Sequence, residues 1–176
     1  MKFWLILGGI LLCFWLYPYL RFLIKRLVFM LRLKKICKNT SLVLTPVHKC
    51  WFLGFHPKKE SCDFLLKKDG EVYAVRLFPL LRHLSALIFN RDQEYTVRRF
   101  VIFFSRFSSA CFHFDSKQKK LCHYWKNVAS ENQAVRKILL IHPCGIDVYG
   151  AERLSGIEVL AAHQFLSELR RESQAK

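Results

Sequence analysis

The stretch ESCDFLLKKDGEVYAVRLF, residues 60–78, decides the fold. Asp69 and Gly70 form the dipeptide that type I′ turns favour, because both central residues of that turn have positive φ. Strand-forming residues lie on either side, and the turn places Phe64 opposite Val75. The sequence therefore predicts an antiparallel β-hairpin with a defined register.

Side chains alternate between the two faces of such a hairpin. We expect one face to point into the core, and it carries Phe64, Leu66, Tyr73, Val75 and Leu77. The register places Asp63 opposite Arg76 on the other face. An acid and a base in this position are typical of a cross-strand ion pair.

Further elements follow the hairpin in the sequence. The run at 84–104 predicts two strands around the polar turn NRDQ, and RKILLIHP at 136–143 predicts a strand that is covered on both faces. Residues 106–135 have no clear periodicity and predict a long loop with one helical turn. The segment 145–161 is typical of a hairpin with a loose loop, and 161–173 predicts a terminal helix with its apolar side facing inward.

The order helix, strand, hairpin, further sheet, buried strand and terminal helix resembles the restriction-endonuclease-like fold of the PD-(D/E)xK nucleases, over residues from about 21 to 172. The resemblance implies that Asp63 occupies the first metal-binding position. The second acidic position then falls on Ala74 and the lysine position on Arg76. An alanine offers no oxygen ligand to a metal ion, and arginine does not release its proton. Glu60 is the nearest replacement acid, but a regular strand places it on the opposite face.

We therefore interpret Asp63 and Arg76 as a degenerate nuclease site or as an ordinary cross-strand pair. The sequence predicts no catalytic residue, no metal ligand and no cofactor. Three Cys/His motifs, at residues 111–113, 122–123 and 142–144, lack the CxxC spacing of a zinc site and are typical of buried thiols. Cys144 and His142 could form a nucleophile pair, but no third orienting group is visible in the sequence.

The first residues are typical of a membrane anchor. Residues 3–20, FWLILGGILLCFWLYPYL, contain no charge and span about 27 Å as a helix, close to the roughly 30 Å of a bilayer's hydrocarbon core. A cleaved signal peptide is the first alternative, but no small residue stands where cleavage would need one. A buried core helix is the second.

Seven basic residues follow within residues 21–38, whereas only Lys2 and the amino terminus precede the uncharged stretch. The positive-inside rule then places the N-terminus outside and the rest of the chain in the cytoplasm. We expect the first helix to continue as one element to about Lys38. At 100° per residue, four of the bases form a stripe about 80° wide that would suit anionic headgroups. They are Arg21, Lys25, Arg32 and Lys35, whereas Arg26, Lys34 and Lys38 lie on other faces of the helix. The alternative is the ordinary charged flank of a single-pass protein.

Seven cysteines, an odd number with irregular spacing, agree with reduced thiols in the cytoplasm. Arg98, Arg99 and the KQKK run at 117–120 were weighed as a nucleic-acid patch. From Glu60 onward, however, eighteen bases face thirteen acids, which is typical of a solvated surface.

The predicted organisation is a transmembrane anchor at 1–20, a basic juxtamembrane helix at 21–38 and a cytoplasmic domain at 39–176. We expect the domain to be α/β, with α+β as the alternative, and to contain a small mixed sheet flanked by helices. The predicted function is a single-pass, non-catalytic cell-membrane protein that binds a protein or nucleic-acid partner and has no small-molecule substrate. The alternatives are a membrane-tethered metal-dependent nuclease with a relocated acidic ligand, and a small structural subunit of a membrane assembly.

Overall fold

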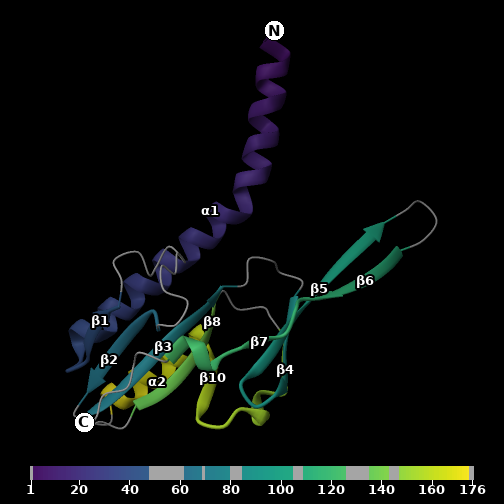
Figure 1. The fold of residues 1–176 in the computed structure, drawn as a ribbon. Helices are drawn as coiled ribbons and strands as arrows, with labels where there is room; N and C mark the ends of the chain where they lie inside the picture. Colours follow the sequence, from purple (N-terminus) through teal and green to yellow (C-terminus); the bar gives the residue numbers. More distant parts are fainter. Residues whose placement is uncertain are drawn as a thin grey trace.

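The computed structural model describes residues 2–47, 62–68, 70–79, 85–104, 109–125, 135–142 and 147–174. In these ranges the chain is mixed α/β, with two mixed β-sheets and two α-helices (Figure 1). The prediction of an α/β fold is confirmed. The prediction of one small sheet flanked by helices is wrong, because helices cover one face of the first sheet and a second sheet covers the other.

The first sheet, sheet A, has the strand order β1-β2-β3-β8-β10. β2 is antiparallel to both β1 and β3, whereas β8 is parallel to both β3 and β10. The strands are β1 (Val43–Pro46), β2 (Phe64–Lys68), β3 (Glu71–Pro79), β8 (Val135–His142) and β10 (Ile157–Ala161).

The β2–β3 hairpin has the predicted register. Phe64 pairs with Val75 and Lys68 with Glu71. Gly70 has a φ of 92°, in the left-handed region that the turn requires, while Asp69 lies outside the described residues. The predicted core face is confirmed: Phe64, Leu66, Tyr73, Val75 and Leu77 are all buried.

The other face of the hairpin is buried as well, which the sequence did not indicate. Ala74 and Leu139 contact sheet B and belong to a second apolar cluster that lies between the two sheets. Sheet A is therefore the middle layer of three. This arrangement explains why the polar pair on that face, Asp63 and Arg76, is removed from solvent.

The second sheet, sheet B, has the order β6-β5-β4-β9, with the short β7 paired to β5. β4 and β5 are the predicted strands around NRDQ, where Gln93 takes a positive φ of 59°. β5 and β6 continue as a two-stranded arm beyond the rest of the sheet (Figure 1). The strands are β4 (Ser85–Arg91), β5 (Glu94–Phe104), β6 (Ser109–Asp115), β7 (Lys119–Lys120) and β9 (Asp147–Tyr149).

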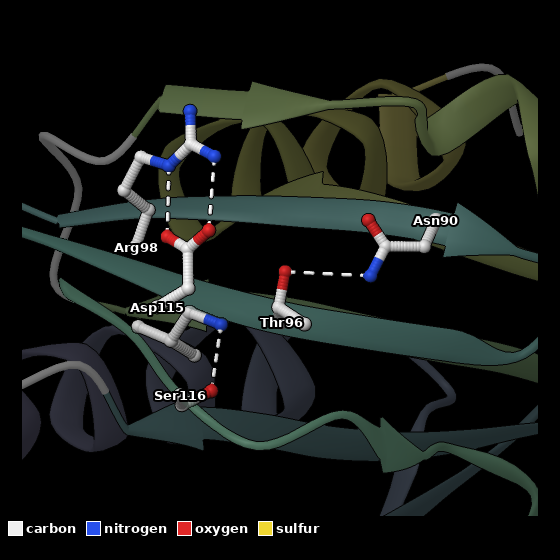
Figure 2. A network of polar contacts seen from close by, with 6 residues as sticks. Asn90, Thr96, Arg98, Asp115 and Ser116 are labelled. Atoms are coloured by element: carbon white, nitrogen blue, oxygen red, sulfur yellow. Dashed lines mark hydrogen bonds and ion pairs between the residues drawn. The ribbon is translucent and has the colours of Figure 1, made fainter. Parts of the chain in front are cut away.

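Polar contacts fasten the end of β6 to β5 (Figure 2). Arg98 donates from Nε and Nη2 to the two carboxylate oxygens of Asp115, at 2.8 and 2.9 Å. The backbone N–H of Val97 donates to Ser116 Oγ at 2.9 Å. The long loop predicted for 106–135 is therefore wrong where β6 and β7 form. The helical turn predicted in this segment corresponds to the 3-10 helix η2 (Cys122–Trp125).

The hairpin predicted for 145–161 is also wrong. β9 pairs with β4 in sheet B, and β10 pairs with β8 in sheet A, so the two strands belong to different sheets. Between them lies a second 3-10 helix, η3 (Ala151–Arg153). The segment connects the two layers, and for that reason its two apolar runs do not pair with each other.

Helix α1 runs from Lys2 to Asn39 as one element, so the predicted continuation of the first helix to residue 38 is confirmed. Its C-terminal half packs on sheet A, and its N-terminal part projects away from the sheets (Figure 1). The helix changes direction between these two parts (Figure 1). Helix α1 contains Pro18, which lacks a backbone N–H.

Helix α2 (Ala162–Gln174) covers the same face of sheet A and turns Phe165, Leu166 and Leu169 inward, as predicted. In the parts of the chain that the structure describes, we find no helix with the length and apolar character of a membrane span. Side chains on α1 are described only from Cys13 onward, so most of the predicted anchor at residues 3–20 lies outside them.

Candidate functional site

Asp63 and Arg76 lie side by side at the start of the hairpin. Arg76 Nε is 3.8 Å from Asp63 Oδ2, and both side chains are almost fully buried. The same carboxylate oxygen accepts a hydrogen bond of 2.6 Å from the backbone N–H of Leu77. The backbone of Asp63 also takes part in the sheet, since its N–H donates to Val75 O and its carbonyl accepts from Val47.

The pair is covered on the side of sheet B by η2. The guanidinium of Arg76 lies 4.5 Å from the centre of the Tyr124 ring, and the Tyr124 hydroxyl is 2.6 Å from that of Tyr95. Trp125 donates its indole N–H to Ala74 O at 3.2 Å. Tyr124 therefore covers the guanidinium of Arg76, and Trp125 covers the neighbouring backbone of β3, on this side.

Arg26 on α1 is a third member of this cluster, and the sequence interpretation placed it on another face of the helix. Its side chain is only 1% exposed. Burial lowers its pKa to about 10; the carboxylate of Asp63 opposes this effect and the cation of Arg76 adds to it. One helical turn on either side are the buried residues Phe22 and Phe29, a spacing that could have shown Arg26 to be on the core face.

The buried cluster contains two guanidinium groups and one carboxylate, and is therefore basic. His142, at the end of β8, lies next to it and is also buried. The pKa of His142 is lowered to about 4 by burial and then by the cations of Arg26 and Lys25, so its ring is neutral near pH 7. Its ring centre lies 5.1 Å from that of Phe29 on α1.

The geometry gives no support to a metal site in the described part of the chain. There, no three His, Cys, Asp or Glu side chains come close enough together to hold a metal ion. Next to Asp63 the strand carries Ala74, whose side chain has no ligand atom, and Arg76, whose cation repels metal ions. Glu60, the acid considered as a replacement, lies outside the described residues.

The thiols and histidines singled out in the sequence fall into two groups. Cys13, Cys37 and Cys62 are free, and burial raises the pKa of Cys62 to about 11, which keeps the thiol protonated. Cys50 and Cys144 lie outside the described residues, as do the side chains of Cys111, His113, Cys122 and His123. Arg98 forms an ion pair with Asp115. One cation of the possible nucleic-acid patch is therefore neutralised.

The basic stripe on α1 lies at the surface. Arg21, Arg32 and Lys35 are exposed and Lys25 is half-buried. Opposite the core face, the helix also exposes large apolar side chains. Leu20, Ile24, Leu27 and Leu31 are 57, 53, 44 and 55% exposed, and they lie within an arc about 60° wide.

No known protein family, curated protein or solved structure matches this chain.

Proposed function

We propose that the protein is a single-pass membrane protein whose α/β domain is held against the membrane surface by helix α1 and has a binding rather than a catalytic role. The observation that carries the proposal is the exposed apolar stripe of Leu20, Ile24, Leu27 and Leu31. Four large apolar side chains on one exposed arc are typical of a surface that is covered in the working protein. The stripe continues directly from the uncharged residues 3–20, so a membrane is the partner that fits it best.

The charges on the same helix support this proposal. Arg21, Lys25, Arg32 and Lys35 lie between the core face and the exposed apolar stripe, where they would reach lipid headgroups while the apolar side chains enter the interface. Each base near an anionic surface contributes about 1 kcal/mol to membrane binding. By the positive-inside rule, the domain would lie in the cytoplasm and the N-terminus outside.

The interior of the domain supports a non-catalytic role. Asp63 and Arg76, the two residues that the nuclease resemblance selects, are buried beneath η2 and bound to each other. The order of helix, strand, hairpin, buried strand and terminal helix is in keeping with a restriction-endonuclease-like fold that has lost its site. The domain would then serve as a platform for a protein or nucleic-acid partner, or as a structural subunit of a membrane assembly.

Fractionation of cells that express the full chain tests the proposal. We expect the protein in the membrane fraction after a carbonate wash, which removes peripheral proteins. Two variants separate the stripe from general hydrophobicity. Leu27→Glu with Leu31→Glu places charge on the exposed stripe and should lower the recovery in the membrane fraction. Val43→Glu places charge on β1 and should leave that recovery unchanged. If the wild-type chain is recovered in the soluble fraction, the proposal is wrong.

A further inference from the structure

A groove of about 300 Å³ lies between α1 and the beginning of α2. One part of its wall is apolar, and another part is basic. The residues that line it are Ile24, Lys25, Val28, Phe29, Arg32, His142, Ala162, His163 and Leu166.

The charged side chains in the groove are of one sign. Lys25 and Arg32 come from α1, and no acid is among the lining residues. The rings of His142 from β8 and His163 from α2 also line the groove. The first residues of α2 also line the groove, and the N–H groups of a first helical turn carry a partial positive charge. The groove therefore favours an anion.

His142 contributes a buried polar ring to the wall of the groove. Its side chain is 7% exposed, and its Nδ1 atom is buried without a hydrogen-bond partner among the described residues. A buried polar nitrogen without a partner is unfavourable, and native proteins rarely keep one. The ring of His142 lines the groove, so a ligand bound there would lie against it.

The apolar wall of the groove reaches the surface that we propose contacts the membrane. Ile24 belongs to the exposed stripe of α1, and Val28, on the next turn, is 40% exposed. The groove therefore offers a ligand from the membrane apolar side chains and basic side chains next to each other. This combination matches a molecule with an acyl chain and an anionic head.

We propose that the groove binds the headgroup of an anionic phospholipid. Its phosphate would lie between Lys25 and Arg32 at the beginning of α2, with the upper part of an acyl chain along Ile24 and Val28. A volume of about 300 Å³ suits a phosphoglycerol head, not a whole lipid. The proposal rests on the proposed membrane attachment and adds a defined lipid site to it.

The test uses the full chain purified in a neutral detergent, with melting temperature as the readout. Dihexanoyl phosphatidylglycerol, a short-chain anionic lipid, should raise the melting temperature by about 3 to 5 °C at ten times its dissociation constant. Dihexanoyl phosphatidylcholine and inorganic phosphate at the same concentration should each give less than a third of that rise.

A matched pair of variants tests the location. Lys25→Gln with Arg32→Gln removes two charges from the groove and should abolish the rise. Arg21→Gln with Lys35→Gln removes two charges from the same stripe but outside the groove and should preserve it. Equal losses in the two pairs, no rise in the wild type, or an equal rise with inorganic phosphate would each overturn the proposal. Recovery of the same wild-type chain in the membrane fraction would show that membrane attachment stands even if the lipid site does not.

Discussion

The guanidinium of Arg76 lies against the carboxylate of Asp63, with 3.8 Å between Nε and Oδ2, and neither side chain reaches solvent. A pair of this kind is costly to break, because the remaining charge stays buried without its counter-charge. Here a second buried cation, Arg26, interacts with the same carboxylate. Asp63 therefore balances charge from two elements, β3 and α1.

The change Asp63→Ala should destabilise the protein by about 3 kcal/mol or more, because it leaves two buried guanidiniums without a carboxylate and removes the acceptor of the Leu77 N–H. Urea unfolding of the full chain in detergent measures the difference. Asp63→Asn is the matched control, since it keeps the size and an acceptor oxygen but removes the charge. If the alanine variant lost less than about 1 kcal/mol, a structural role for the pair would be contradicted.

Divalent metal should have no specific effect on the wild type. A metal ion that binds only the folded protein raises its melting temperature. We therefore expect the same melting temperature with millimolar Mg²⁺ or Mn²⁺ as with equal ionic strength of NaCl. An increase that disappears in Asp63→Asn would instead favour the alternative of a metal-dependent nuclease.

Stability should fall in acid through His142. Its pKa is about 4 in the folded protein against an ordinary 6.5, so between these values the unfolded chain binds a proton that the folded chain does not. Stability is therefore lost as pH falls from about 6.5 to about 4, by at most about 3 kcal/mol. The cations that face this ring come from α1, where they are Lys25 and Arg26, and His163 of α2 lines the same groove.

The comparison of the wild type with His142→Phe isolates this effect, because phenylalanine keeps a ring against Phe29 and removes the titration. The free energy of unfolding of the variant should depend less on pH between 4 and 6.5. Parallel curves for the two proteins would show that His142 is not held neutral by its surroundings.

Arg26→Met should raise the pKa of His142, since Arg26 is the larger of the two charge effects that lower it. Stability should change by less than about 1 kcal/mol, because methionine fills a similar space and Asp63 keeps Arg76. Titration of the His142 ring protons by NMR measures the pKa. Lys35→Met serves as the control, because Lys35 is an exposed cation on the same helix and does not line the groove of His142. If the pKa of His142 were the same in Arg26→Met as in the wild type, the effect of the Arg26 cation on the His142 ring would be contradicted.

The parts of the fold that follow local rules could be predicted from the sequence. The Asp69-Gly70 pair determined the hairpin register because turn length determines which residues face each other. The apolar run of β8 indicated a strand covered on both faces, and Phe165, Leu166 and Leu169 indicated the inner side of α2. In each case the signal lies within one short segment.

The remainder depends on contacts between distant segments. Only seven residues, 150–156, lie between β9 and β10, yet β9 pairs with β4 and β10 pairs with β8 in the other sheet, and this choice leaves no local pattern. β6 pairs along its whole length with β5, although its segment is rich in polar residues. The candidate site could be predicted only in part. The sequence pattern indicated Asp63 and Arg76. It placed Arg26 on another face of the helix, although Arg26 lies one turn from each of the core residues Phe22 and Phe29.

The central claim, that α1 rests on the membrane through Leu20, Ile24, Leu27 and Leu31, is tested most directly by photocrosslinking in native membranes. A photoreactive benzoylphenylalanine is placed at Leu27, which is 44% exposed on the stripe, and separately at Tyr149, which is 55% exposed on sheet B. We predict phospholipid adducts at position 27, identified by mass spectrometry, and none at position 149. Absence of lipid adducts at position 27, or equal yields at the two positions, would contradict the account.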